Sequence, residues 1–202
     1  MEEEGLIIVK NAKNDETRLV NRWNLILEEE MPTKEEMVSF KTRYQKEPLY
    51  LMKNAYENFM SLKNEALKHH YEVEAEDTFR TYQDQLDTIH YFIETIGEEE
   101  ALKRVSPLGA SEHHTGLAID IVFYRNNQVI EGDELKKTDE DYKWVLEHLS
   151  DYGFILRYPE NSFQTTGVIY EPWHIRYVGK ELAQYLEKNH LLLEEYYENL
   201  KS

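Results

Sequence analysis

Two short clusters of side chains, roughly fifty residues apart, could carry chemistry together. The first is the segment from Ser111 to Asp120, Ser-Glu-His-His-Thr-Gly-Leu-Ala-Ile-Asp, in which His113 and Asp120 lie seven residues apart. The second is Glu171-Pro172-Trp173-His174. A carboxylate in a buried strand needs a cation or hydrogen bonds, because desolvating its charge is costly. We therefore expect His113, Asp120 and His174 to hold one zinc ion.

Strand periodicity puts these candidate ligands on a common side of a sheet. In a strand over 117–123, Asp120 points away from the apolar residues at alternate positions, and His174 does the same in a strand over 173–178. Two strands can then each project one ligand into a cleft, while His113 reaches it from a loop. Three protein ligands with an open fourth position are typical of a catalytic zinc site rather than a structural one.

Glu171 is the candidate general base. It lies three residues before His174 with Pro172 between them, so it belongs to a loop or to the start of a strand. A carboxylate there can reach a zinc-bound water without being a ligand itself. Because zinc lowers the pKa of such a water towards ~7, Glu171 is expected to accept its proton and then to protonate the leaving amine.

Taken singly, these motifs have little specificity. An isolated His–Asp pair in a strand is more often structural than metallic, and Glu187-x-x-His190 repeats the spacing of the second cluster on what we interpret as a solvated helix face. The joint pattern is what favours a metal. Four other histidines, His69, His70, His90 and His148, are expected to be surface or satisfied core residues. His114, inside the first cluster, is expected to be a bystander.

The elements that must position the clusters are predicted from hydrophobic periodicity and from capping residues. Helical spacing predicts a long amphipathic helix over 49–69 and a second helix over 77–96 that ends at Gly97. Thr33 followed by Glu36 predicts a helix that begins near Lys34. The remaining predictions are a short strand over 6–9, strands over 71–75, 117–123, 129–130, 154–156 and 173–178, a turn at 126–127, a helix of about three turns capped by Thr138, and two short helices over 180–189 and 193–200.

This order of elements predicts an α+β fold, with helices concentrated early and strands in the middle. We expect a single domain with a small central, mostly antiparallel sheet that carries the zinc site and is flanked by helices. The length of 202 residues fits one domain. We divide the chain into an irregular leading segment, 1–33, and the domain itself, 34–202.

The composition excludes several classes of function. A formal net charge of −17, from 40 acidic and 23 basic residues, makes nucleic acid an unexpected partner. The chain has no cysteine, which excludes disulfides, thiolate zinc sites and cysteine nucleophiles. No apolar run approaches the ~18–20 residues of a membrane span. The acidic start, Met1-Glu2-Glu3-Glu4, is unlike a secretory signal and favours the cytoplasm. The alternative is an exported or membrane-anchored domain whose targeting segment was removed.

The clusters together resemble the motifs of the zinc D-alanyl-D-alanine carboxypeptidases and dipeptidases of the VanY, VanX and VanXY type, with the LD-carboxypeptidases of the same family. The resemblance rests on Ser111-x-His113-x-x-Gly116-x-Ala118-x-Asp120 and Glu171-x-x-His174, and it is clearest over 70–200. It extends to three longer segments: Phe79-Arg80-Thr81-Tyr82-x-x-Gln85, Tyr152-Gly153-Phe154-Ile155-Leu156-Arg157-Tyr158-Pro159 and Glu171-Pro172-Trp173-His174-Ile175-Arg176-Tyr177-Val178-Gly179.

The resemblance implies a role for each matching residue. His113, Asp120 and His174 are implied to be the zinc ligands and Glu171 the catalytic base. Arg80 is implied to steady the scissile carbonyl or the substrate carboxylate, for which an arginine fork is suited. Ser111 and Gln85 are implied to bind the C-terminal end of the substrate. Arg157 and Arg176 are weaker candidates, for which we favour a structural or supporting role. One departure precedes Arg80, where Asp77-Thr78-Phe79 stands in place of the more usual Ser-Gly-Tyr.

On this basis the expected activity is that of a zinc metallopeptidase that removes a C-terminal D-amino acid, D-Ala, from peptidoglycan stem peptides or precursors. Such enzymes include determinants of glycopeptide resistance. Two enzymatic alternatives stay open: a D-Ala-D-Ala dipeptidase, alone or combined with carboxypeptidase activity, and an LD-carboxypeptidase acting on tetrapeptides. The non-enzymatic alternative is a cell-wall-binding pseudoenzyme. The sequence predicts no particular oligomeric state.

Overall fold

Asp120 and His174 lie on neighbouring strands of a five-stranded sheet in the computed structural model, which describes residues 15–200. Four strands form the order β3 (Glu72–Asp77), β4 (Ala118–Arg125), β7 (His174–Tyr177) and β6 (Phe154–Leu156), and β5 (Gln128–Ile130) pairs with the end of β4. These strand pairs are all antiparallel. The predicted α+β fold with a small antiparallel sheet is therefore confirmed.

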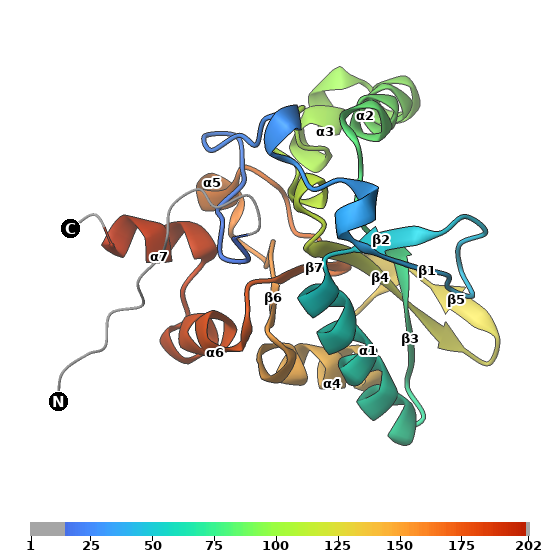
Figure 1. Cartoon of the computed structure of the whole chain (residues 1–202). Helices are drawn as coiled ribbons and strands as arrows, with labels where there is room; N and C mark the ends of the chain where they lie inside the picture. The colour runs from blue at the N-terminus through green and yellow to red at the C-terminus, as the bar shows by residue number, and fades with distance from the viewer. Residues whose placement is uncertain (1–14, 201–202) are drawn as a thin grey trace, which may run out of the picture.

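Helices α1 (Lys53–Lys68) and α4 (Glu140–His148) cover one face of this sheet (Figure 1). Phe59 and Leu62 of α1 pack in one buried cluster with every second residue of β4. Full burial of a side chain of this size contributes about 1.5–3 kcal/mol, so the cluster fixes which face of β4 is the core face. The intervening residues of β4, Asp120 among them, are turned to the other face.

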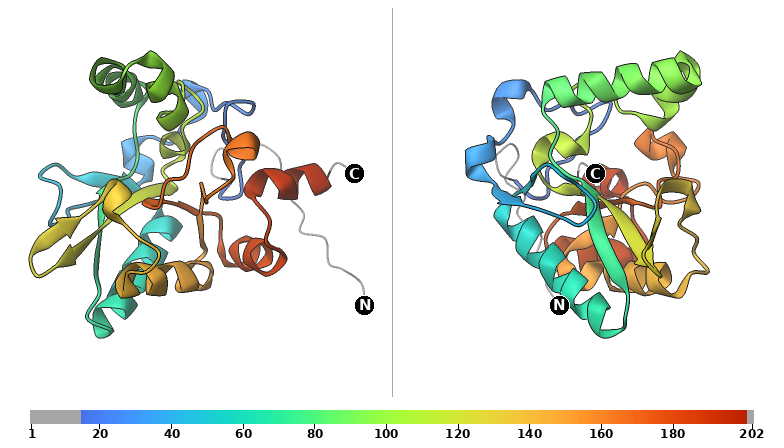
Figure 2. Two further views of the ribbon diagram at one scale, coloured as in Figure 1. Left: turned by 180° about the vertical axis from the view of Figure 1, so that it is seen from behind. Right: turned by 90° about the vertical axis from the view of Figure 1, so that its right-hand side faces the viewer.

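Helices α2 (Tyr82–Ile96) and α3 (Glu98–Arg104) lie on the opposite side of the molecule from α1 and α4 in all the views of Figures 1 and 2. The remaining helices are α5 (Phe163–Thr166), α6 (Lys180–Asn189) and α7 (Leu193–Asn199). A separate buried cluster joins α6 to α7 through Leu182, Leu186 and Leu193. The candidate ligands thus lie between the sheet and the α2–α3 pair, outside the main core.

Two predicted helices begin too early. Leu49–Leu51 is strand β2, paired antiparallel with β1 (Val38–Phe40), and α1 starts only at Lys53. The second helix starts at Tyr82, because β3 continues to Asp77 through a register shift and the chain then turns. The first error arises because Leu49-Tyr50-Leu51 is a short apolar run, which fits a strand as well as a helix.

Two other local predictions also differ from the structure. The capping box at Thr33 forms, with the Glu36 carboxylate accepting from the Thr33 N–H at 2.8 Å, but it closes a single 3-10 turn over Lys34–Glu36 rather than opening a longer helix. Helix α3 was not predicted. The predicted strand over 6–9 lies outside the described residues, and the boundary at residue 33 stays a prediction.

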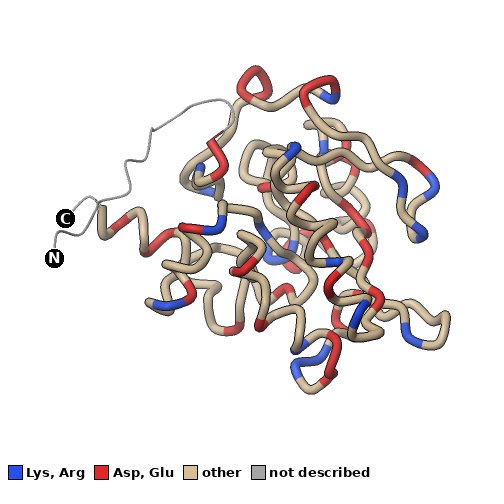
Figure 3. Tube along the Cα trace, turned by 60° about the horizontal axis from the view of Figure 1, so that its bottom comes forward, with Lys and Arg blue, Asp and Glu red and all other residues tan. Residues whose placement is uncertain are grey.

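The turn at Asn126 and Asn127 is confirmed. Both residues have positive φ, +51° and +64°, a backbone conformation that asparagine tolerates better than most residues and that suits a tight hairpin between β4 and β5. Acidic residues are spread over most elements rather than gathered on one (Figure 3). Within residues 15–200, no helix is both long and apolar enough to cross a membrane.

Candidate metal centre and active site

The centre is built where β4 and β7 pair. Asp120 is directly opposite His174 in the register, so both side chains project from the same face of the sheet. His113 comes from a 3-10 turn over Glu112–Thr115, which ends at Gly116 with φ +66°. One donor atom from each of His113, Asp120 and His174 lies within 4.8 Å of the others, and all three residues are buried.

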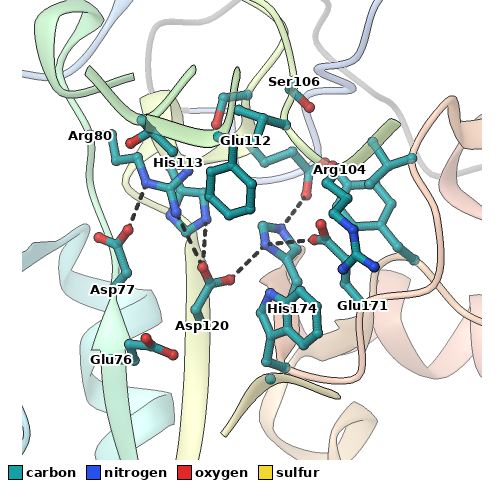
Figure 4. A pocket seen from close by; sticks show the side chains of 18 of the residues that line it. Glu76, Asp77, Arg80, Arg104, Ser106, Glu112, His113, Asp120, Glu171 and His174 are labelled. Atoms are coloured by element: carbon teal, nitrogen blue, oxygen red, sulfur yellow. Dashed lines mark hydrogen bonds and ion pairs between the residues drawn. The ribbon is translucent and has the colours of Figure 1, made fainter. Parts of the chain in front are cut away.

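Hydrogen bonds fix the orientation of both imidazoles (Figure 4). The Nδ1 of His113 donates to the backbone carbonyl of Thr78, which leaves its Nε2 facing Oδ2 of Asp120 at 3.4 Å. The Nδ1 of His174 lies 2.9 Å from Oδ1 of Asp120. The Nε2 of His113, the Nδ1 of His174 and the Asp120 carboxylate therefore converge on one point.

This donor set fits zinc. Two imidazole nitrogens and one carboxylate oxygen match the ligand types of zinc sites without cysteine. Burial alone would raise the pKa of Asp120, but His113 and His174 hold it well below its usual range. Burial alone would lower the pKa of His174, but the nearby carboxylates of Asp120 and Glu112 outweigh that effect and raise the pKa to about 9. The buried carboxylate thus favours positive charge at the centre.

Glu171 stands beside this group without belonging to it. Its backbone N–H donates to the carbonyl of Tyr158 at 3.0 Å, and its Oε2 lies 3.9 Å from Nδ1 of His174. Burial raises the pKa of Glu171 to about 8, and the charge of Asp120 acts in the same direction against the opposing effect of His174. A carboxyl with such a pKa can accept and release a proton near neutral pH.

Arg80 is held rigidly on the other side of the centre. Its guanidinium donates to Asp77 at 2.6 Å, to Gln85 at 3.2 Å and to Asp120 at 3.3 Å. Its backbone carbonyl accepts from Nδ1 of His114 at 2.9 Å. Asp77, which marks the departure from the family motif, therefore orients this arginine.

All the predicted site residues line one cavity of about 350 Å³. The amide of Gln85 is engaged by Arg80 and by the carbonyl of Ser106 at 2.7 Å, so in this structure it supports the arginine. His114 is buried and stacks on Tyr82, in keeping with a core histidine. The predicted site residues on the cavity wall are Arg80, Gln85, Ser111, His113, Asp120, Glu171 and His174.

Sequence reasoning missed three residues of this site. Tyr158 carries the backbone carbonyl that holds Glu171, and its ring centroid is 4.9 Å from that of His174. Arg104, at the end of α3, brings a second cation to the cavity wall. Glu112 reaches His174 from between two recognised motif residues. A charged residue inside a buried motif indicates a buried partner, but Arg157 and Arg176, the partners of Glu112, lie far from it in the sequence.

Comparison with known proteins gives one family and several similar proteins. Residues 48–180 match the VanY family, described as D-alanyl-D-alanine carboxypeptidase. The D-alanyl-D-alanine carboxypeptidase of Enterococcus faecium is 35% identical over 158 residues, covering 76% of this chain and 46% of that protein. The solved LdcB LD-carboxypeptidase has a TM-score of 0.79 at 35% identity, covering 92% of this chain and 87% of that one.

A second solved structure is similar and contains a metal. A single-residue variant of the vancomycin-resistance D,D-pentapeptidase VanY in complex with Zn(II) has a TM-score of 0.72 at 27% identity, covering 90% of this chain and 98% of that one. The chain spans about half the length of the curated relatives that it matches, 58% of one and 46% of another.

Proposed function

Because the chain belongs to the VanY family of D-alanyl-D-alanine carboxypeptidases, we propose that it is a zinc metallopeptidase that removes a C-terminal D-Ala from peptidoglycan stem peptides or their precursors. The observation that carries the proposal is the buried convergence of His113, Asp120 and His174, with Glu171 on the wall of the same cavity. The zinc-containing VanY neighbour supports the choice of metal.

His113, Asp120 and His174 would hold the ion. The chemistry that zinc supplies when held by three protein ligands is polarisation of a carbonyl and activation of water. The chain contributes the rest: burial excludes bulk water, and the Thr78 carbonyl and the Asp120 carboxylate orient the two imidazoles.

Glu171 is the proposed proton carrier. Its carboxylate accepts a proton as a water molecule attacks the scissile carbonyl carbon, and it returns that proton to the departing amine nitrogen when the C–N bond breaks. The products are a shortened peptide and a free D-amino acid. The high pKa of the buried carboxyl suits both transfers, because the group can hold the proton between the two steps.

Arg80 is the proposed anion-binding residue. Its guanidinium lines the cavity and is already ordered by Asp77 and Gln85, so little freedom is lost when it binds a substrate carboxylate or the oxyanion. Ser111 lies buried on the same wall and is proposed to contact the C-terminal end of the substrate.

An LD-carboxypeptidase is the second candidate, favoured by the similarity to LdcB over most of both chains. The two activities differ in the chirality of the residue before the scissile bond. Dipeptidase activity differs again, because it requires a free amino group close to that bond.

The test is a panel of substrates offered to the zinc-loaded protein. The panel contains the dipeptide D-Ala-D-Ala, a pentapeptide that ends in D-Ala-D-Ala, and a tetrapeptide that ends in a single D-Ala after an L-centre. We expect release of D-Ala from the pentapeptide. Release from the tetrapeptide alone would instead favour an LD-carboxypeptidase. The control is His113→Ala, which should abolish release. Binding of all three peptides without cleavage would contradict the proposal and favour a pseudoenzyme.

A further inference from the structure

Two buried polar atoms next to the proposed metal centre face each other, and neither has a hydrogen-bond partner among residues 15–200. They are Oε2 of Glu112 and Nε2 of His174, which lie 3.5 Å apart (Figure 4). We propose that Glu112 is a positioning residue: its carboxylate accepts a hydrogen bond from the Nε2–H of His174, which keeps the proton on Nε2 and leaves Nδ1 of that imidazole free for the metal. The inference rests on the proposed metal centre and names a residue that supports it.

The tautomer of His174 decides which of its two ring nitrogens can bind a metal. A neutral imidazole carries one proton, and the nitrogen without it is the one that can bind a metal. Nδ1 faces Asp120 at 2.9 Å, on the side where the candidate ligands converge, while Nε2 faces Glu112. A carboxylate behind Nε2 stabilises the proton there and makes the other nitrogen a better ligand.

Two arginines hold the Glu112 carboxylate in place. Its other oxygen, Oε1, accepts from Nε of Arg157 at 2.7 Å and from Nη1 of Arg176 at 2.8 Å. The side chains of all three residues are fully buried. Two guanidinium groups on one oxygen hold the carboxylate in a single orientation and leave Oε2 directed at the imidazole.

Other groups of the chain hold these two arginines in turn. Arg157 donates to both oxygens of Glu194 on α7, at 2.9 and 2.6 Å. Arg176 donates through Nη2 to the backbone carbonyls of Glu16 and Arg18, at 3.1 and 2.9 Å. Two carboxylates therefore balance two guanidinium groups in one buried cluster, which we call the Glu112 cluster: Glu112, Arg157, Arg176 and Glu194.

A purely structural reading is that the Glu112 cluster only joins segments of the chain. Glu194 separates this interpretation from ours, because it is a buried carboxylate on the same arginine and its hydrogen bonds are with Arg157 and Asn21. Loss of charge at either Glu112 or Glu194 should destabilise the fold, since each leaves a guanidinium under-compensated. Only loss of charge at Glu112 should weaken the binding of zinc.

The experiment compares wild type, Glu112→Gln and the matched control Glu194→Gln by chelator competition for Zn²⁺. We expect Glu112→Gln to raise the zinc Kd by about 10–100-fold and Glu194→Gln to change it by less than about 3-fold. Thermal unfolding of the metal-free proteins records the structural effect separately. An unchanged Kd in Glu112→Gln, or equal changes in both variants, would overturn the proposal.

A second measurement needs no variant, in case Glu112→Gln does not fold. In zinc-loaded wild type, imidazole ¹H–¹⁵N spectra should show His174 protonated at Nε2, with that proton protected from exchange, and coordinated through Nδ1. Coordination through Nε2 would overturn the role of Glu112. Zinc binding without peptide cleavage would contradict the proposed activity alone, whereas a wild type that binds no zinc would overturn the metal centre and this role together.

Discussion

At the scale of single residues, two carboxyl groups of the site differ in how readily they hold a proton. His113 and His174 keep the pKa of Asp120 low, whereas burial raises the pKa of Glu171 on the wall of the same cavity. Two carboxyls in one cavity are thus suited to different tasks: one stays ionised, and the other can carry a proton.

This difference predicts the effect of Glu171→Gln. The variant should lower kcat/KM for D-Ala release by about 10²–10⁴-fold, because it removes the proton carrier, while the zinc content stays at the wild-type level. Steady-state kinetics and metal analysis of the same sample check both parts. A variant that retains activity within a few-fold would contradict the assigned role, and one that loses zinc would make Glu171 a ligand.

Glu76 gives a pH dependence at the same scale. Burial, together with the charges of Asp120 and Glu131, raises its pKa from 4.5 to about 7, and the phenol of Tyr44 donates to it at 3.3 Å. The charge of Asp77 also raises the pKa of Glu76, by a smaller amount. Between these two pH values the folded protein binds more protons than the unfolded chain, so the contribution to stability present below pH 4.5 is lost as the pH rises through 7.

The variant Glu76→Gln should remove this part of the pH dependence, because its side chain is neutral throughout. The difference in the free energy of unfolding, variant minus wild type, should therefore be larger at pH 8 than at pH 5. Thermal unfolding of both metal-free proteins across this range measures the difference, and parallel curves for the two proteins would argue against the assignment.

At the scale of elements, β6 and β7 depend on the turn at Gly153. Its φ is +80°, and a Cβ there would lie 2.7 Å from the Tyr177 ring and 3.0 Å from the backbone nitrogen of Lys180. The carbonyl of Gly153 also accepts from Val178 at 2.9 Å, which sets the edge of the sheet next to the strand of His174.

Gly153→Ala should therefore lower the free energy of unfolding by about 2–4 kcal/mol, from left-handed backbone strain and the clash together. Gly132→Ala is the matched control, since Gly132 also has positive φ, +52°, but no atom of the described part of the chain lies within 4 Å of its Cβ position. The control should cost about 1–2 kcal/mol. Denaturant unfolding measures both, and equal costs would mean that the contacts at Gly153 relax.

The elements also show where the sequence was informative. The alternation in 117–123 and 173–178 correctly predicted that Asp120 and His174 share a face, because one face of each strand is strongly apolar. The strand at Leu49–Leu51 was not predictable, because it exists through pairing with β1 and through Tyr50, whose backbone nitrogen donates to Thr78 at 3.2 Å. The role of Glu112 was hidden for the same reason, since Arg157 and Arg176 are brought to it only by the sheet.

At the scale of the whole molecule, the proposed zinc ion should stabilise the fold. Its ligands come from β4, from β7 and from the turn before β4, so binding requires the assembled sheet. Free Zn²⁺ at about 100 times its Kd should raise the free energy of unfolding by about 2.7 kcal/mol. For a chain of this size the melting temperature should rise by about 5–11 °C.

Differential scanning calorimetry with and without zinc tests this expectation. His174→Ala is the control, and its melting temperature should not respond to zinc over the same concentrations. A wild type whose melting temperature is insensitive to zinc would contradict the metal centre.

The register of β4 against β7 has a consequence for refolding. Asp120 stands opposite His174, and their neighbours Ile119 and Ile175 stand opposite each other on the core face. A slip of one residue would turn one strand over, bury an imidazole or a carboxylate among aliphatic side chains and remove it from its partner. Such misregistered molecules could not assemble the three ligands. The amount of zinc bound per chain in a refolded preparation would therefore report the fraction of molecules in which β4 and β7 are paired in the correct register.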